Sequence, residues 1–491
     1  MDGRGEPVVA MKRESFKQRP CESRVPEVLH RGRACRSSNE GCDKRLEQRT
    51  CPIRLRKGVN RKREEQMETA KVFEITKQEV WRAYLHVKRN GGAAGIDKES
   101  LSDFAKDEKN LLYKLWNRLS SGSYFPPAVR GLEIPKKSGG VRMLGIPTVA
   151  DRIAQQVAKQ RLEPVLDPLF HEDSYGYRAN KSAIQAIDVT RRRCWKMDWV
   201  LEFDIKGLFD NIDHELLMKA VRKHCDTKWI LLYVERWLKA PMQKPNGEIM
   251  TRDKGTPQGG VISPLLSNLF LHYTFDAWMK RNYPESPFAR FADDAVIHCK
   301  SEQQAQELLE KLKQRFGECM LELHPTKTKI VYCKDGYRRG EYGTQKFKFL
   351  GYTFQPRLSH SKRKNNYFVS FSPAVSREAE TSFRESIRGL RIHARSDLGI
   401  EDIAKMINPI VRGWTGYFGH FLPSRMKRTL TYLDRVLVAW AKRKYKNLRG
   451  TGRKARNWLI RVAHKAQELF VHWKLGVLPG RLKGKAPTSA S

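Results

Sequence analysis

The chain has 491 residues, of which 40% are hydrophobic and 30% charged, enough for a large core and roughly two to four domains. Its formal net charge of +40 opposes compaction unless a polyanion neutralises it, and nucleic acid is the usual polyanion. A cationic surface kept for solubility is the alternative, whereas a membrane-spanning protein is excluded because no apolar run approaches the ~20 residues of a spanning helix.

Residues 1–68 differ in composition from the rest of the chain. They are rich in Arg, Glu, Ser and Cys, poor in aromatic residues, and show no clear apolar period. We expect a basic, mostly disordered extension there. An Arg-rich N-terminus is also typical of a transit peptide, but the many acids of this one argue against that interpretation.

Residues 69–372 carry both helical and strand patterns, which predict an α+β fold class for this part. Helices are predicted at 72–87, 111–119, 149–166, 181–194, 214–224, 229–238 and 304–316. Strands are predicted at 132–135, 141–146, 199–204, 289–298, 329–333 and 347–354. The first two strands should form a hairpin around a Gly-Gly turn, and 289–298 should form another.

Beyond about residue 373 the strand signals fade. Aromatic residues such as Trp440 and Trp473 are spaced among Lys and Arg in a helical pattern. We therefore expect an all-helical domain over 373–482 and a disordered tail over 483–491. These aromatic residues would serve either as nucleic-acid contacts or as ordinary core.

Two adjacent acids, Asp293 and Asp294, fall between apolar residues where a buried hairpin would turn. Asp204 ends a similar apolar stretch. Taken separately, Asp204 would cap a strand end and the pair would be surface acids of a turn. Carboxylates forced together repel each other, and a divalent metal removes that conflict. Together the three acids predict a two-metal phosphoryl-transfer site, and hence a nucleic-acid polymerase.

In such a site one Mg²⁺ lowers the pKa of the primer 3′-OH and the other stabilises the leaving pyrophosphate. Asp204 and Asp293 would bridge the two ions, and Asp294 would be the weaker ligand. Mn²⁺ would substitute for Mg²⁺.

Seven blocks in order resemble a reverse transcriptase of the group II intron-encoded type. They are residues 132–142, 173–180, 203–210, 255–264, 291–294, 324–329 and 349–352. The block from Gln258 to Pro264 is similar to intron-type enzymes and differs from the corresponding block of diversity-generating retroelement enzymes. The resemblance implies a right-hand polymerase, with fingers and palm over 69–372 and a helical thumb, or maturase domain, over 373–482.

The resemblance also implies which residues bind the incoming nucleotide. Lys136 and Arg142 would bind its triphosphate, with an exposed cationic hairpin as the alternative. Phe209 would exclude a 2′-OH by its bulk, with plain core as the alternative. Gln258 would hydrogen-bond near the sugar. Ile205 is implied as a further ligand of metal and nucleotide.

Other residues are matched to the primer side of the site. Lys327 corresponds to the family's lysine after the catalytic hairpin, with Lys329 as a substitute. The primer grip would consist of Leu350, Gly351 and Tyr352, although Tyr352 would also suit ordinary core. Glycines 259 and 260 would let the main chain approach the substrate.

One position departs from the family pattern. Phe291 stands where Tyr is usual, so the aromatic ring is kept and the hydroxyl is lost. We expect stacking near the primer terminus to survive and the enzyme to be active, with altered fidelity or efficiency.

The basic helices after Gly413–Phe418 resemble the maturase domain. Helices that combine Arg or Lys with Trp or Tyr are suited to RNA phosphates. The cations expected to bind RNA are Arg425, Lys427, Arg428, Lys442, Arg443, Lys444, Arg453, Lys454 and Arg456. Near the other end, Asn90–Asp97 resembles the N-terminal extension of intron enzymes, with a flexible glycine turn as the alternative.

The implied function is RNA-directed DNA synthesis by a group II intron protein that also binds its intron RNA and promotes splicing and mobility. Its partners would be that RNA, an RNA template with a DNA primer, dNTPs and target DNA, and no membrane. The alternatives are a splicing-only maturase with an idle polymerase site, a host-domesticated reverse transcriptase in repair or defence, and an RNA-dependent RNA polymerase.

The cysteines give a further expectation. The nine cysteines are scattered without C-x₂₋₄-C spacing, which suits reduced thiols in a bacterial cytoplasm or, alternatively, an organelle, and does not support a zinc site. We also expect no cysteine-rich endonuclease domain, and no more than a short DNA-binding segment, at the C-terminus.

Overall fold

The computed structural model describes residues 71–135, 140–338, 340–361, 365–450 and 452–480. All of them belong to the unit that begins at Lys71. The predicted extension 1–68, the predicted tail 483–491 and Lys136 lie outside the described residues.

Three helices open the described chain: α2 (Lys77–Asn90), α3 (Leu101–Lys106) and α4 (Glu108–Ser120). The sequence prediction started α2 at residue 72, which is wrong by five residues. Thr76 is the N-cap instead, because its side chain accepts from the main chain of Glu79 while the Glu79 carboxylate accepts from Thr76. The short α3 was not predicted.

A hairpin of β1 (Val129–Pro135) and β2 (Val141–Ile146) follows, as the sequence predicted. The short strands β4 (Met242–Gln243) and β5 (Ile249–Met250) extend it into a four-stranded sheet of order β2-β1-β4-β5. Helix α5 (Val149–Leu166) has the predicted bounds.

The second sheet carries the acids. Its order is β6-β7-β3-β8, with every neighbouring pair antiparallel. The strands are β3 (Trp199–Asp204), β6 (Phe288–Phe291), β7 (Asp294–Cys299) and β8 (Lys329–Tyr332). The helices around it are α6 (Ala183–Cys194), α7 (Leu208–Asn211), α8 (His214–His224), α9 (Lys228–Lys239), α10 (Ser263–Leu271), α11 (Ala277–Asn282) and α12 (Glu302–Glu318). Between α10 and α11 the chain makes one π-helical turn, His272–Asp276.

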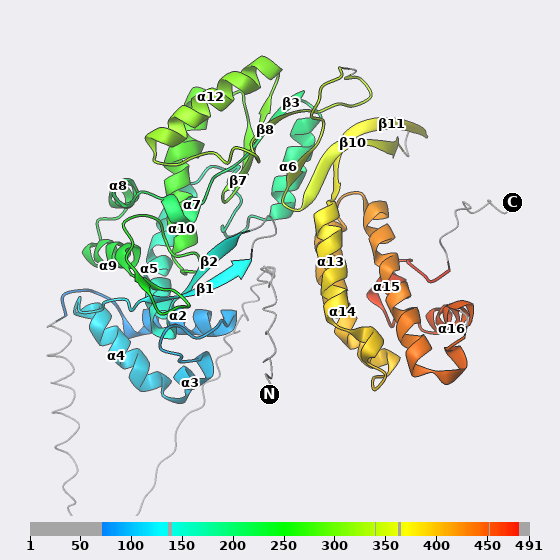
Figure 1. Ribbon diagram of the computed structural model, residues 1–491. Helices are drawn as coiled ribbons and strands as arrows, with labels where there is room; N and C mark the ends of the chain where they lie inside the picture. Colours follow the sequence, from blue (N-terminus) through cyan, green and yellow to red (C-terminus); the bar gives the residue numbers. More distant parts are fainter. Residues whose placement is uncertain (1–70, 136–139, 339, 362–364, 451, 481–491) are drawn as a thin grey trace, which may run out of the picture. The chain divides into compact units, whose positions relative to one another are not determined.

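The third sheet differs from the prediction. One strand was expected at 347–354, but the chain turns at Leu350–Gly351 and forms β9 (Phe347–Phe349) and β10 (Tyr352–Ser361). Strand β10 pairs along its whole length with β11 (Asn366–Val375), which was not predicted. Figure 1 shows the two as a long curved hairpin. The last strand therefore ends at Val375 rather than before residue 373.

In the part of the chain that the structure describes after β11, all elements are helical, as expected. They are α13 (Arg377–Gly389), α14 (Ile400–Phe418), α15 (Pro423–Lys444), α16 (Gly452–Lys465) and α17 (Val471–Lys474). Two 3₁₀ turns of the described chain lie among these helices, at Ile392–Ala394 and Lys446–Leu448. Another, Asp167–Leu169, follows α5.

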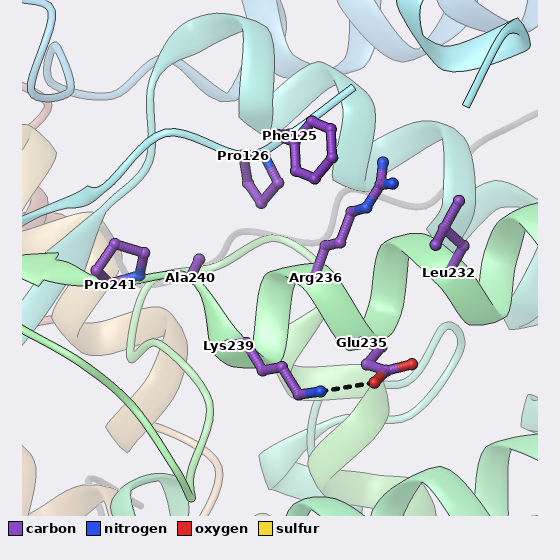
Figure 2. A pocket seen from close by; sticks show the side chains of 8 residues that line it. All are labelled: Phe125, Pro126, Leu232, Glu235, Arg236, Lys239, Ala240 and Pro241. Atoms are coloured by element: carbon purple, nitrogen blue, oxygen red, sulfur yellow. Dashed lines mark hydrogen bonds and ion pairs between the residues drawn. The ribbon is translucent and has the colours of Figure 1, made fainter. Parts of the chain in front are cut away.

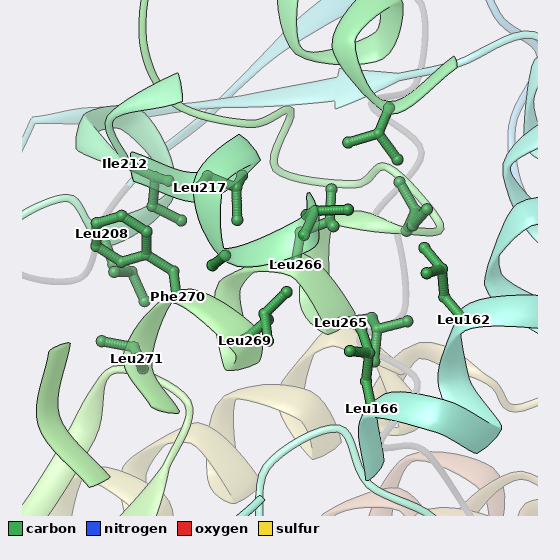
Figure 3. Packing of buried hydrophobic residues seen from close by; sticks show 14 of the residues in the cluster. Leu162, Leu166, Leu208, Ile212, Leu217, Leu265, Leu266, Leu269, Phe270 and Leu271 are labelled. Carbon is green, nitrogen blue, oxygen red and sulfur yellow. The ribbon is translucent and has the colours of Figure 1, made fainter. Parts of the chain in front are cut away.

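Two apolar clusters hold these elements together. In the first, leucines of α10 such as Leu266 and Leu269 pack among residues of α5, α7 and α8, namely Leu162, Leu208 and Leu217 (Figure 3). The second cluster joins the β9–β11 sheet to the C-terminal helices. Burying each such side chain contributes roughly 1.5–3 kcal/mol to the free energy of folding. The first cluster thereby stabilises the sheet whose strand ends carry the acids.

Candidate active site

The three predicted acids lie at one end of the β6-β7-β3-β8 sheet. Asp204, the last residue of β3, is directly opposite Asp294, the first residue of β7. Directly opposed residues of an antiparallel pair share a face. Asp293 lies in the turn between β6 and β7, next to Ala292, whose φ is 58°. The structure thus brings together acids that are far apart in the sequence.

Crowding changes the acidity of these carboxyl groups. Burial raises the pKa of Asp293, and the charge of Asp204 raises that pKa further. Burial, and then the charges of Asp293, Glu202 and Asp204, hold the pKa of Asp294 well above its usual range. Hard cations bind carboxylate oxygens and cancel such repulsion, so this donor set fits a divalent ion. Glu202 was missed by the sequence analysis because one strand residue between apolar neighbours gives no signal.

A lysine neutralises part of this cluster. Lys327 donates to Oδ2 of Asp204 and forms an ion pair with it. Lys329 instead pairs with Glu202 at 3.2 Å, so the structure distinguishes the two lysines that the sequence left open. Within the described ranges no group of three or more His, Cys, Asp or Glu side chains is arranged as a metal cage. The carboxylates suit a divalent ion chemically, but Lys327 occupies Asp204 in this structure and a metal would have to displace it.

Ile205 is almost fully buried, at 3% exposure. Its side chain packs in the core, and its main chain bridges Leu323. Any contact with metal or nucleotide would therefore have to come from its main-chain carbonyl.

Arg142 is exposed on β2, and its charge acts on Asp293 and on Tyr177. Tyr177 was not singled out by the sequence analysis. It has a φ of 58°, is 47% exposed, and its ring lies 6.4 Å from that of Phe291. Its place near the acids follows from the fold and from no local pattern.

Phe209 and Gln258 lie on neighbouring segments. The main-chain N–H of Thr256 donates to the carbonyl of Phe209 at 2.6 Å, which fixes the backbone that carries the aromatic ring. The Nε2 group of Gln258 donates to both carboxylate oxygens of Asp210, at 3.1 and 3.0 Å. Asp210 therefore orients the Gln258 amide, although the sequence analysis gave it no role.

The two glycines after Gln258 have a role within the chain itself. An added Cβ at Gly259 would lie 2.3 Å from the carbonyl oxygen of Gly145 on β2, and φ at Gly259 is 121°. An added Cβ at Gly260 would lie 2.5 Å from Oγ of Ser263. Within the chain the close approach is to β2 and α10, and the expected approach of these glycines to the substrate stays a prediction.

The expected primer-grip residues form the turn between β9 and β10. Leu350 and Gly351 have φ values of 50° and 79°, and the main chain of Leu350 hydrogen-bonds Asp294. Tyr352 is fully buried, which agrees with its alternative as core. Its hydroxyl donates to the carbonyl of Tyr417 on α14.

The expected RNA-binding cations fall into two groups. Arg425 pairs with Glu380 at 3.1 Å, and Lys444 donates to the carbonyls of Ser396 and Leu398. These two therefore have partners within the helical domain, and their expected contact with RNA stays a prediction. The exposed members of the set are Lys427, Arg428, Arg443, Arg453, Lys454 and Arg456, and Lys442 is half-buried. Trp440 and Trp473 are fully buried, so they are core.

Residues 90–97 are held in place by an arginine. The guanidinium of Arg152 on α5 donates to the carbonyls of Gly91 and Ala93, at 2.9 and 3.0 Å. An added Cβ at Gly95 would lie 2.6 Å from Cα of Thr148. This segment is thus packed against the start of α5, and a free glycine turn is the wrong description of it.

A groove of about 410 Å³ lies elsewhere on the fold, beside α9 (Figure 2). The guanidinium of Arg236 covers the ring of Phe125 there, 3.9 Å from its centroid. None of the three acids lines this groove. Within the described residues, no helix is both long and apolar enough to cross a membrane.

Comparison with known families agrees with this geometry. A family model described as reverse transcriptase (RNA-dependent DNA polymerase) matches residues 134–354, which include all three acids. A second model, described as group II intron, maturase-specific domain, matches residues 381–458 on α13 to α16.

Individual relatives point the same way. Protein YkfC of Escherichia coli (strain K12) is 31% identical over 284 residues, or 50% of this chain and 73% of YkfC. Group II intron-encoded protein LtrA of Lactococcus lactis is 35% identical over 193 residues, or 39% of this chain and 32% of LtrA. The putative COX1/OXI3 intron 1 protein of Saccharomyces cerevisiae is 31% identical over 40% of this chain and 24% of its own length. The chain thus spans most of YkfC but at most a third of the other two relatives.

Proposed function

This chain belongs to the group II intron-encoded reverse transcriptases, and on that premise we propose that it copies RNA into DNA at the Asp204–Asp293–Asp294 site. The proposal is carried by one observation, the register that sets Asp204 opposite Asp294 with Asp293 in the adjoining turn. In this proposal the fingers and palm end with β11, and the thumb begins at α13.

The residues at the sheet end would hold two Mg²⁺ ions. Their ligands would be the carboxylates of Asp204, Asp293 and Asp294, together with the main-chain carbonyl of Ile205. When bound, the metals would activate the primer 3′-OH and neutralise the leaving pyrophosphate. The pKa values of Asp293 and Asp294 are raised by burial first and by the neighbouring acid charges second, and a bound cation would relieve that second cause.

The protein's own side chains would position the substrates. Arg142 would pair with the triphosphate. Its charge acts on Asp293, so it lies close enough to the acids to meet a nucleotide bound there. Phe209 would bar a ribose 2′-OH, and Gln258, oriented by Asp210, would contact the nucleotide. The turn Leu350–Gly351 would support the primer end beside Asp294.

Primer extension tests the polymerase proposal. The wild-type protein should extend a DNA primer on an RNA template with Mg²⁺, and Asp293→Ala should abolish extension while remaining folded. A useful control is Asp226→Ala, because Asp226 is an exposed acid in the loop before α9. A folded wild-type protein that never extends the primer would instead support a splicing-only maturase.

We further propose that the same protein binds its intron RNA and promotes splicing. The maturase-specific match and the exposed cations of α15 and α16 support this role. Cations would offset phosphate repulsion so that the RNA folds, and the RNA itself would perform the splicing chemistry. Asp293→Ala should therefore retain splicing assistance in a self-splicing assay. Loss of splicing together with extension in that folded variant would contradict two separable roles.

A further inference from the structure

Arg290 is the most deeply buried cation near the acids. It lies on β6, two residues before Ala292, and is 1% exposed. Its guanidinium pairs with Asp276, itself 0% exposed, at 2.6 Å. A buried charge needs a partner and further hydrogen bonds to be tolerated. Arg290 makes those further bonds to three elements: to the carbonyl of Ala292 at 3.1 Å, to Oδ1 of Asn268 at 3.1 Å and to Oγ of Ser174 at 2.8 Å.

The bond to Ala292 bears directly on Asp293. Ala292 has a φ of 58°, a left-handed conformation that a residue with a Cβ adopts only when its surroundings hold it there. The direction in which Asp293 leaves the strand depends on that conformation. Arg290 therefore holds Ala292 in the conformation that sets the direction of the Asp293 side chain.

A strap from Asp173 to Gly176 holds the same turn from the other side. The main chain of Arg290 exchanges two hydrogen bonds with this strap: the N–H of Arg290 donates to the carbonyl of Asp173, and the N–H of Tyr175 donates to the carbonyl of Arg290. An added Cβ at Gly176 would lie 2.5 Å from the main-chain nitrogen of Ala292. The side chain of Asn268 secures the carbonyl of Gly176 at 2.7 Å.

Asp276 reaches Arg290 from the π-helical turn His272–Asp276. Such a turn inserts an extra residue into a helix and changes the direction of the side chains that follow, and it recurs at functional sites. Asp276 and Asn268, from this helix, and Ser174, from a segment about ninety residues earlier, thus meet on one guanidinium.

We propose that Arg290, buried against Asp276, is a positioning residue that holds the Ala292–Asp293 turn in the conformation needed for metal binding. This inference rests on the proposed polymerase function and adds to it a residue that touches neither metal nor substrate. The fork of the guanidinium reaches Ala292, Asn268 and Ser174 together, which a lysine in its place could not do.

The test compares Arg290→Lys with Arg338→Lys. Arg338 is a matched control because its guanidinium is also largely buried, pairs with Asp198 and donates to the carbonyls of Cys194 and Cys333. Its partner Asp198 precedes β3, at the end of that strand opposite to Asp204. Both variants keep the positive charge and lose the planar guanidinium group that makes several hydrogen bonds at once. Each is assayed by thermal unfolding, by steady-state primer extension, and by calorimetric titration with Mn²⁺.

Arg290→Lys should lower kcat by about tenfold to a hundredfold with little change in the KM for dNTP, because a small misplacement of a reacting group costs that much. It should also weaken Mn²⁺ binding. Arg338→Lys should lose comparable thermal stability and keep both kcat and Mn²⁺ affinity. Equal losses in the two variants, or unchanged kcat and Mn²⁺ binding in Arg290→Lys, would overturn the proposal.

A substitution at Gly176 perturbs the Ala292–Asp293 turn and leaves the Arg290–Asp276 ion pair unchanged. Gly176→Ala should reproduce the loss of kcat and of Mn²⁺ affinity, whereas Gly389→Ala should not, because an added Cβ there meets no atom within 4 Å. If Arg290→Lys fails to fold, Gly176→Ala decides, and normal Mn²⁺ binding by it would overturn the proposal. A wild-type protein that binds Mn²⁺ but does not extend primers would contradict the polymerase function alone, since Mn²⁺ binding still tests the positioning role.

Discussion

The hydroxyl of Tyr417 donates a hydrogen bond to the carbonyl of Leu350 at 2.8 Å. Tyr417 belongs to α14, in the region that matches the maturase-specific domain, and Leu350 belongs to the turn that contacts Asp294. The Tyr352 hydroxyl donates in return to the carbonyl of Tyr417. The maturase region is therefore tied directly to the turn beside the acids.

Removing one hydroxyl tests this connection. Tyr417→Phe should loosen the turn and lower the rate or length of primer extension several-fold, because a lost hydrogen bond of this kind is worth about 0.5–1.5 kcal/mol. Tyr445→Phe is the matched control, since its half-buried ring lies in the same domain, away from the turn. Extension products under single-turnover conditions provide the measurement. Equal extension by both variants would contradict the connection.

The two lysines near the acids should differ in importance. Lys327 pairs with Asp204, whereas Lys329 pairs with Glu202. Lys327→Ala should therefore lower kcat on the order of tenfold to a hundredfold, because a metal on Asp204 would release the Lys327 charge toward the triphosphate, and the variant lacks that charge. Lys329→Ala should have a smaller effect. Primer extension at saturating dNTP separates them, and the reverse order of effects would refute the placement of Lys327.

The stability that Asp294 contributes without metal should fall as the pH rises. The pKa of Asp294 is held well above its usual range in the folded protein. The folded state therefore binds that proton more tightly than the unfolded state, and the stabilisation is lost as the pH rises through the folded-state pKa. Thermal unfolding in a chelator should show Asp294→Asn losing less stability than wild type between about pH 4 and about pH 8.

An internal reference makes that comparison sharper. Burial raises the pKa of Asp151 to about 6, so it contributes a loss of the same sign in both proteins and cancels in the difference. Added Mg²⁺ should restore wild-type stability at high pH and leave Asp294→Asn less affected. Parallel profiles of stability against pH for the two proteins in chelator would show that Asp294 does not cause the loss of stability at high pH.

Phe209 should set the choice of sugar. Its backbone is fixed by Thr256, and its ring is half-buried. Phe209→Ala should raise the use of ribonucleotides relative to deoxyribonucleotides by about tenfold or more, because removing bulk opens room for the 2′-OH. Competing rNTP and dNTP incorporation on one template gives the ratio. An unchanged ratio would favour the core interpretation of Phe209.

Salt dependence tests the RNA surface. Arg428 and Arg456 are exposed, so reversing either charge should reduce the slope of log affinity against log salt by roughly 0.7–0.9 for each lost phosphate contact. Arg425→Gln should mainly lower the thermal midpoint, because Arg425 pairs with Glu380. Filter binding of intron RNA at several salt concentrations distinguishes the two. A slope unchanged by both reversals would move the RNA surface elsewhere.

Much of the acid-bearing fold could be predicted from local pattern. Strand β3 and helix α5 have the predicted bounds, because each has an apolar pattern of the right period and clear end signals. The β10–β11 hairpin was missed because Pro356 and Pro373 lie within its strands and the basic stretch between them resembles a loop.

Other features depend on contacts between distant segments, which no local pattern encodes. The turn at Leu350 needs a positive φ at a residue that is not glycine, so the sequence indicated an unbroken strand. The Asp210–Gln258 pair and the Arg290–Asp276 pair form only once the fold is complete. The acids themselves were found because their residue type, order and apolar surroundings are visible in the sequence.

The most direct test locates the metal. A crystal of the protein with RNA template, DNA primer, a non-hydrolysable dNTP analogue and Mn²⁺ would show the ions by their anomalous signal. We predict two ions between the carboxylates of Asp204 and Asp293, at the primer 3′ end, with Asp294 beside them. Ions bound elsewhere, or a primer end far from these acids, would contradict the central claim.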